Sequence, residues 1–334
     1  MGWFIDQLPV RAFATTALAV TAFAGGMPAQ AETGRTLRMG YILATDSQLG
    51  AGAAAMGDEL AKRTGGRLTI EQFPNSALGG EVEMLKGVQL GTIDLAFITG
   101  APLPNIVPDV GVFNIPFLFR NAAHAHAVLD GPIGQSYLQK FRAKDLVALA
   151  WGENGVRHIT NAKHAVAAPD DLKGLRLRLP QSEVMLAGFK ALGADVSPLP
   201  FPQLYDALKT GQFDGQENPI ATILASKFAQ VQKYLTLSGH VYDPAIIVMS
   251  ADSFDDLTEG DRQAVAAAAK IGAEASRNYA AEAERKGVVV LTEAGMQVTS
   301  QIDRGKFVTA LSPAVPDFEK RFGADTIAAM RNFE

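Results

Sequence analysis

Hydrophobic and polar residues alternate along the chain with two different periods, one typical of strands and one typical of helices. Residues 68–73 alternate apolar and polar positions, which is the period of a half-buried strand, and Pro74 ends the run. Residues 81–90 instead carry apolar residues three positions apart and are followed by Gly91, a helix stop signal. The same patterns predict strands at residues 36–43, 93–98, 146–151, 155–160 and 175–179, and helices at residues 49–63, 182–192 and 202–209.

The order of these segments predicts the fold class. Strands alternate with helices, and this rhythm favours an α/β architecture with mostly parallel sheets. One segment is longer than a small domain needs. In residues 259–286, from the end of the first turn onward, only Gly272 would weaken a helix, and Thr258 with Asp261 forms a capping box at its start. A continuous helix there would be roughly 40 Å long and could pack against both halves of the molecule. Two helices that meet at Gly272 are the alternative.

The first 31 residues have the layout of a secretory signal peptide. Arg11 precedes an apolar run at residues 12–24, Pro28 breaks any helix, and the small-x-small sequence at residues 29–31 is a cleavage signal. The apolar run is shorter than the roughly 20 residues that span a bilayer. We therefore predict export to the periplasm, cleavage near Ala31 and no membrane insertion. An N-terminus that packs into the core is the alternative.

Composition narrows the function further. The sequence has no cysteine, which excludes disulfides, thiolate metal sites and cysteine nucleophiles. The formal net charge is −5, and no run of Lys and Arg suggests a nucleic-acid groove. We therefore predict no nucleic-acid partner. A mildly acidic protein that bound a small acid would need a local basic feature.

Sequence patterns that would indicate an enzyme or a metal site are missing. The five histidines lack the spacing of metal ligands, and His124 and His126 would point to different sides of a helix. Residues 50–55 are rich in Gly and Ala and follow a strand, but residues 44–49 separate them from it, unlike a dinucleotide fingerprint. We predict no cofactor, no metal and no catalytic residue.

Two stretches carry candidate binding chemistry. In residues 172–180 the alternation puts Arg176 and Arg178 on one face of a strand and leucines on the other. An arginine near a strand end can project into a crevice, where its planar fork matches a carboxylate. Two solvated arginines at an edge are the alternative. In residues 214–219 a loop could present Asn218 to a ligand, or Asn218 could cap the following helix.

These stretches resemble the solute-binding subunits of tripartite ATP-independent periplasmic (TRAP) transporters, the dicarboxylate-binding-protein (DctP) family. The segments that carry the resemblance run in order along nearly the whole chain: residues 73–79, 89–94, 151–157, 172–180 and 214–219. The long helix also fits, because family members have one that lies across both lobes.

The resemblance implies two α/β lobes that close on a ligand by hinge motion. Lobe I would comprise residues 32–155 plus about 244–272, and lobe II residues 156–243 plus about 273–334. It also implies that the protein delivers a small organic acid to the membrane subunits of the transporter, as a binding protein and not as an enzyme.

The resemblance further implies which residues contact the ligand. Arg178 matches the arginine that pairs with the ligand carboxylate, and Arg157 matches a second ligand-facing arginine. Asn218 matches a ligand-contacting asparagine, and Gln181 stands where sialic-acid binders have asparagine. Thr99 replaces a glutamate of those binders, which makes sialic acid doubtful.

Further contacts complete the predicted cleft. Phe201 and Tyr205 match aromatic wall positions of the family. Polar residues assigned to the cleft, several of them from loop position alone, are Asn154, Asp46, His240 and Asp243. Many neutral donors and acceptors suit a polyhydroxylated ligand, so we favour a sugar acid, either a uronate or an aldonate. A C4-dicarboxylate, with Arg157 on its second carboxylate, is the alternative. An exported hydrolase is a more distant one, because no nucleophile–base set is recognisable.

Overall fold

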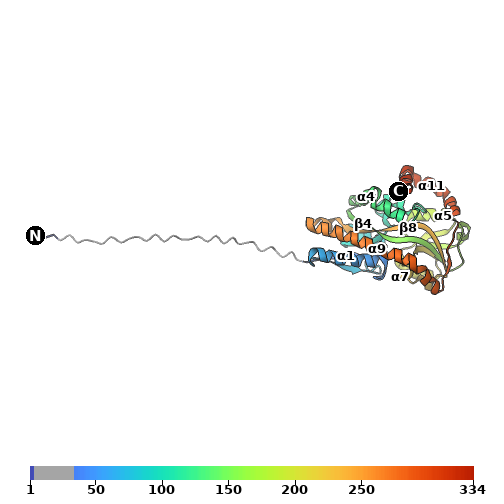
Figure 1. Ribbon diagram of the computed structural model, residues 1–334, viewed down its shortest axis with the longest axis horizontal. Coiled ribbons are helices and arrows are strands. Elements are labelled where there is room, and N and C mark those ends of the chain that lie inside the picture. The colour runs from blue at the N-terminus through green and yellow to red at the C-terminus, as the bar shows by residue number, and fades with distance from the viewer. Residues whose placement is uncertain (4–33) are drawn as a thin grey trace. The chain divides into compact units, whose positions relative to one another are not determined.

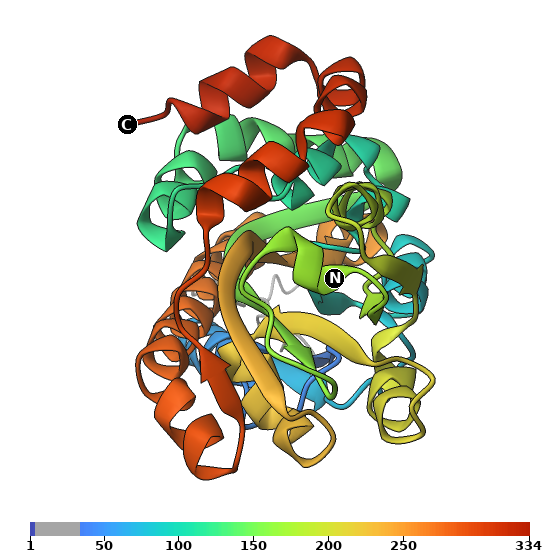
Figure 2. The same ribbon diagram turned by 90° about the vertical axis from the view of Figure 1, so that its right-hand side faces the viewer.

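The computed structural model describes residues 1–3 and 34–334. The predicted signal peptide and its cleavage site therefore lie almost entirely outside the described residues. Residues 34–334 form one compact unit, drawn in Figures 1 and 2. Helices and strands follow one another along this unit, and the predicted α/β class is confirmed.

The strands of residues 34–334 form a single mixed sheet in the order β2-β1-β3-β8-β4-β7-β5-β6, with β9 paired to β8. Their bounds are β1 (Arg35–Gly40), β2 (Leu68–Phe73), β3 (Leu95–Thr99), β4 (Leu146–Asn161), β5 (Arg176–Leu179), β6 (Asp195–Pro198), β7 (Gly215–Pro219), β8 (Tyr234–Ser250) and β9 (Gln297–Thr299). Pairs within each half of the sheet are parallel, whereas β4 and β8 run antiparallel to each other and to β7 and β3 respectively.

Helices cover this sheet. Their bounds are α1 (Gln48–Thr64), α2 (Glu81–Gln89), α3 (Ala122–Asp130), α4 (Pro132–Gln139), α5 (Glu183–Ala191), α6 (Leu204–Lys209), α7 (Ile220–Ala225), α8 (Ala251–Asp255), α9 (Glu259–Glu293), α10 (Arg304–Ala310), α11 (Val315–Phe322) and α12 (Ala324–Arg331). In the described part of the chain, none of them has the length and apolar character needed to cross a membrane.

The long strands β4 and β8 join the two halves of the sheet. β3 pairs with the last residues of β8, while β7 pairs with the last residues of β4. The sequence analysis predicted two strands, at residues 146–151 and 155–160, where the structure has the single strand β4. The ladder with β8 shifts register between Glu153 and Gly155, at the position where the sequence pattern is interrupted. Gly155 has φ 133°, a conformation that L side chains rarely adopt. The sequence analysis did not predict β8.

Each half of the sheet has apolar cores of its own. The largest cluster surrounds β1, β3 and the second half of β8 and includes Phe97 and Trp151. Two smaller clusters lie around β5 and around α6 and α7. Phe318 and Met330, from the C-terminal helices, belong to the largest cluster, and Figure 2 shows these helices in red beside the green ones of residues 122–139. The lobe boundaries stay a prediction.

Helix α9 is one continuous helix of 35 residues, so the alternative of two helices is wrong. Its first turn is capped by Thr258, whose side chain accepts a hydrogen bond from the backbone N–H of Asp261. It packs along α1 and then against α7, as Figure 1 shows. Gly272 permits the contact with α1, because a Cβ there would stand 2.7 Å from the carbonyl oxygen of Gly52.

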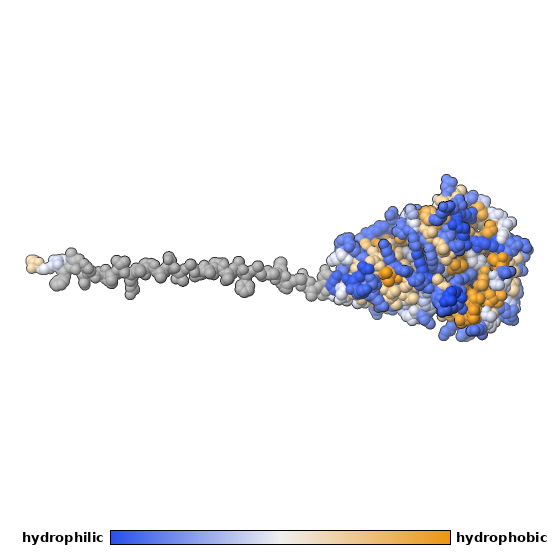
Figure 3. Space-filling model, viewed as in Figure 1, coloured by the Kyte–Doolittle hydropathy of each residue, from blue (hydrophilic) through white to orange (hydrophobic). Residues whose placement is uncertain are grey.

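The surface of the protein carries both hydrophilic and apolar residues. Figure 3 shows hydrophilic residues over most of one face and apolar residues gathered at its lower right. The exposed apolar side chains of α9 include Tyr279, Val289 and Val290. Single exposed apolar residues are ordinary on protein surfaces.

We expect Gly272→Ala to lower the free energy of unfolding by about 1–3 kcal/mol, because the new Cβ meets backbone and cannot be accommodated without a shift of α1. Thermal unfolding measures this as a fall in Tm of about 2–4 °C per kcal/mol. Gly260→Ala, on the same helix, is the control. Nothing lies within 4 Å of a Cβ there, so alanine should stabilise slightly. Equal destabilisation by both substitutions would contradict this account of the α1–α9 contact.

Candidate functional site

A buried ion-pair cluster lies where β4, β7 and β8 meet. The Nε of Arg157 donates to Glu217 Oε2 at 2.5 Å, and Nη2 donates to Glu217 Oε1 at 2.7 Å. Nη1 donates to Asp243 Oδ2 at 2.6 Å. The strand register explains the meeting, because β4 pairs with β7 on one side of Arg157 and with β8 on the other. All three side chains are buried.

Within this cluster, the positive charge of Arg157 is balanced by the carboxylates of Glu217 and Asp243. Burial disfavours the charged form of Arg157, but the charges of Glu217 and Asp243 hold its pKa above the ordinary value. Arg157 Nη2 also donates to the carbonyl oxygen of Glu217 and to Asn218 Oδ1. A guanidinium has five N–H groups, and in Arg157 only one of them, on Nη1, has no hydrogen-bond partner among the described residues. Arg157 therefore lacks the paired N–H groups that would grip a second ligand carboxylate.

Other predicted site residues join the same network. Asn154 Nδ2 donates to Asp243 Oδ2 at 2.7 Å. His240 Nε2 lies 3.0 Å from Glu217 Oε2, and its other ring nitrogen lies 2.7 Å from the hydroxyl of Ser238. Burial lowers the pKa of His240, which favours the neutral ring. The network thus fixes the orientation of polar side chains on three strands.

Asn218 belongs to a strand and not to the predicted loop. It lies in β7, and its Nδ2 donates to Gln216 Oε1 at 2.5 Å. Helix α7 begins one residue after Pro219, and Asn218 does not cap it, so that alternative is wrong. Between Arg157 and Gln216, the amide of Asn218 is held in one orientation.

Arg178 differs sharply from Arg157. Its side chain is 2% exposed, and its Nε donates to the carbonyl oxygen of Leu199 at 2.8 Å. Neither Nη1 nor Nη2 has a hydrogen-bond or ion-pair partner within residues 34–334. Burial lowers the pKa of Arg178 to about 9, although Glu217 and Glu81 favour its charged form. A buried guanidinium with this free edge is suited to a bidentate carboxylate.

Arg176, two residues earlier, is a useful contrast. Its side chain is 48% exposed and pairs with Asp214, with Nη2 2.9 Å from Oδ1. Its Nε also donates to Asp214 Oδ2 at 3.0 Å. The alternative of two solvated arginines therefore describes Arg176 and is wrong for Arg178.

Glu81 is a residue of this region that the sequence analysis missed. Its Oε1 accepts a hydrogen bond from the backbone N–H of Thr99 at 2.7 Å, at the end of β3. Burial raises the pKa of Glu81 to about 7, and the charge of Asp243 adds to this while that of Arg178 opposes it. The sequence analysis missed Glu81 because a glutamate in the first turn of a helix is already favoured by the helix dipole and needs no further role.

The remaining predicted residues have contacts that do not reach this network. Gln181 follows β5, and its carbonyl oxygen accepts from Asn105. Phe201 packs between two apolar clusters. The hydroxyl of Tyr205 donates to Gln230 Oε1, and exposed Asp46 accepts a bond from Tyr279 through its backbone. Their roles in binding stay predictions.

The arrangement can recognise an anion that carries hydroxyl groups. Arg178 offers a positive charge without an ion-pair partner in residues 34–334, and Glu81 lies close enough to feel the charges of both Arg178 and Asp243. Asp243 Oδ1 has no hydrogen-bond partner among these residues. Within the described residues, no group of three or more His, Asp or Glu side chains is placed to hold a metal ion.

Known proteins are similar to this chain over most of its length. The sequence model of bacterial extracellular solute-binding protein family 7 (DctP) matches residues 39–321. The 2,3-diketo-L-gulonate-binding periplasmic protein YiaO of Escherichia coli K12 is 38% identical over 300 residues, which cover 89% of this chain and 91% of its own.

Solved structures extend the likeness to the fold. A TRAP periplasmic solute-binding protein from Polaromonas sp. JS666, bound to D-erythronate, has a TM-score of 0.89 and 45% identity, and the match covers 90% of this chain and 99% of that one. The sugar acid binding protein DctPAm from Advenella mimigardefordensis, in complex with galactonate, has a TM-score of 0.87 and 36% identity over 90% of this chain and 97% of its own. The resemblance to TRAP solute-binding subunits is therefore confirmed, and with it the two-lobed fold class.

We expect Glu217→Gln to cost about 3–5 kcal/mol in the free energy of unfolding, because it leaves a buried arginine only partly paired. Equilibrium unfolding in urea measures the loss. Glu282→Gln is the matched control and should change stability little, since Glu282 forms solvent-exposed pairs on α9. If the two variants were equally stable, the Arg157–Glu217 pair would not stabilise the fold. The argument that this pair keeps Arg157 from holding a second ligand carboxylate would then be contradicted.

Proposed function

We propose that this chain, which belongs to bacterial extracellular solute-binding protein family 7, captures a sugar acid of the aldonate or uronate type. It then delivers the acid to the membrane subunits of a TRAP transporter. The observation that carries the proposal is the free edge of the buried Arg178 guanidinium. A buried cation with two unpaired nitrogens gains most from a carboxylate that reaches both of them.

Capture follows from contacts with both halves of the sheet. Arg178 and Asn218 belong to β5 and β7, whereas Thr99 and Glu81 belong to β3 and α2. A ligand that touches all four favours the closed arrangement by the contacts made only on closing. Release to the membrane subunits then requires that the two halves separate.

Two arguments favour a sugar acid over a C4-dicarboxylate. Arg157, the residue expected to hold a second carboxylate, already pairs with Glu217 and Asp243. The acidic side chains Asp243 and Glu81 would repel a second carboxylate but can accept ligand hydroxyl groups. Three of the more similar relatives favour a sugar acid, since they are described with D-erythronate, galactonate and 2,3-diketo-L-gulonate. Two less similar ones, at 31% and 29% identity, are described with a C4-dicarboxylate and with succinate.

The N-terminal sequence supports export. Residues 1–31 carry the pattern of a signal peptide, and we propose that cleavage near Ala31 releases the mature protein into the periplasm. There the protein binds its ligand without converting it. Mass spectrometry of the periplasmic protein tests the cleavage position, and an unchanged ligand recovered after incubation tests the absence of turnover.

We expect D-galactonate, D-erythronate and D-glucuronate, but not succinate or malate, to raise the Tm of the ligand-free protein. A ligand present at 100 times its Kd adds about 2.7 kcal/mol of stability, which is a clear shift in thermal unfolding. A shift with dicarboxylates alone would replace the sugar-acid proposal with the dicarboxylate one. A shift with no acid, after bound ligand has been removed by unfolding and refolding, would overturn capture through Arg178.

We expect Arg178→Lys to weaken binding of the identified acid by at least about 30-fold, because an ammonium cannot form the two parallel hydrogen bonds. Isothermal titration calorimetry measures the change. Arg176→Lys is the matched control on the same strand, and it should keep the affinity within about twofold, since Arg176 pairs with Asp214. An Arg178→Lys variant that bound as tightly as the control would contradict the anchor assignment.

A further inference from the structure

The first half of β4 forms a free edge of the sheet. Residues 146–148 and 150–153 pair with β8 on one side, with a register shift at Leu149, whereas β7 pairs with β4 only along residues 157–161. No strand of residues 34–334 pairs with the other side of residues 146–153. At the inner end, the N–H of Glu153 donates to Ser276 Oγ at 3.1 Å, so α9 closes the edge there. The preceding residues, 147–151, are left as an open edge.

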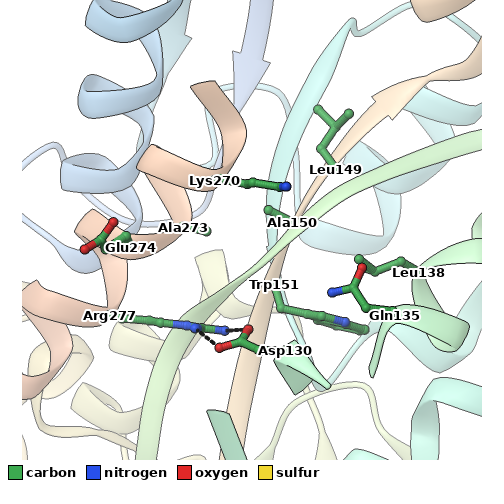
Figure 4. A pocket seen from close by; sticks show the side chains of 10 residues that line it. All are labelled: Asp130, Gln135, Leu138, Leu149, Ala150, Trp151, Lys270, Ala273, Glu274 and Arg277. Atoms are coloured by element: carbon green, nitrogen blue, oxygen red, sulfur yellow. Dashed lines mark hydrogen bonds and ion pairs between the residues drawn. The ribbon is translucent and has the colours of Figure 1, made fainter. Parts of the chain in front are cut away.

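Two adjoining pockets follow this edge. One has a volume of about 400 Å³ and is drawn in Figure 4, and the other has a volume of about 290 Å³. They share Gln135, Leu138 and Leu149. Together they are lined by every residue of β4 from 146 to 151. Side chains of a strand point to opposite faces on either side of the shift at Leu149, so a run of lining residues from both faces means that the backbone edge forms the floor.

The edge lies at the bottom of a groove. Helix α4 and the turn after it (Lys140–Lys144) form one wall. Beside residues 149–151, α9 forms the other wall with Lys270, Ala273 and Arg277. Six residues at about 3.3 Å each give a floor roughly 20 Å long. Two such recessed edges could not meet without collision of their walls. The groove therefore fits a single extended chain and excludes edge-to-edge pairing with a second copy.

The charges in the groove indicate the chemistry of its occupant. Arg277 is neutralised by Asp130, at 2.7 and 2.8 Å, and Arg142 pairs with Asp255. Lys270 forms no ion pair within the described part of the chain. Figure 4 shows Lys270 ending beside Ala150 and the Gln135 amide pointing into the pocket from the opposite side, while the Glu274 carboxylate points away. The groove thus presents one unneutralised ammonium and one amide beside apolar side chains.

We propose that this groove binds an extended peptide segment of another protein by strand addition to β4. The segment alternates apolar residues with polar ones and places an acidic side chain beside Lys270. Main-chain hydrogen bonds to the free edge supply the affinity, and Leu138 and Leu149 receive an apolar side chain of the segment. The flanking helices protect the edge from unselective pairing, which an open edge would otherwise invite.

The test uses the protein purified from the periplasm and a synthetic probe. The probe is a fluorescent peptide of about seven residues, with valine and threonine alternating and aspartate at the centre, long enough to cover the floor. We expect saturable binding with a Kd below about 1 mM, measured by fluorescence anisotropy. Hydrogen exchange of the amides of residues 147–149, which are half exposed, should slow on binding.

Matched probes and variants distinguish the mode of binding. Two versions of the peptide carry N-methyl groups on alternate residues, one set on each edge. Strand addition predicts that one version loses binding and that the other keeps it. Lys270→Glu should weaken binding about fivefold or more, and Lys286→Glu, on the same helix outside the groove, should not. Arg178→Lys should leave peptide binding unchanged, which separates this proposal from the function of the cleft.

Three results would overturn the proposal. The first is no saturable binding of the peptide below about 1 mM. The second is equal binding of both N-methylated versions, which would exclude main-chain pairing. The third is full competition by glutarate, a small dicarboxylate without a peptide backbone, which would make the groove a site for small carboxylates.

Discussion

The ion pairs of Arg157 with Glu217 and Asp243 are the constraint on which the rest of the site depends. They join β4, β7 and β8 where the two halves of the sheet meet. Burying a guanidinium is costly, and only two carboxylates with good geometry offset that cost. Because Arg157 is paired inside the protein, we propose that the charge offered to a ligand comes from Arg178.

The proposed roles of the two arginines support a ligand with a single carboxylate. One free buried arginine suits one carboxylate, and the surrounding hydroxyl, amide and carboxyl groups suit a chain of hydroxyls. Glu81 strengthens the argument, because its burial beside Thr99 puts a carboxyl group with a pKa of about 7 in the same region. A second negative charge on the ligand would find no cation to match it there.

Much of this could be predicted from the sequence, and the failures have physical reasons. Apolar periodicity and caps identified α9 and the α/β class, since both are local signals. Strand β8 was missed because Gly239 and Pro244 resemble breaks within it. The engagement of Arg157 was missed because it depends on the register of β4 against β7 and β8, which is long-range. The resemblance predicted Arg178 as the anchor, and the structure adds that Arg178 is buried while Arg176 is half exposed and paired with Asp214.

A crystal structure of the protein with D-galactonate tests the central claim most directly. The account predicts that both carboxylate oxygens of the ligand lie within hydrogen-bond distance of Nη1 and Nη2 of Arg178, about 2.7–2.9 Å. It also predicts that Arg157 keeps its ion pairs with Glu217 and Asp243. A ligand carboxylate bound to Arg157, with either of those pairs broken, would contradict the account.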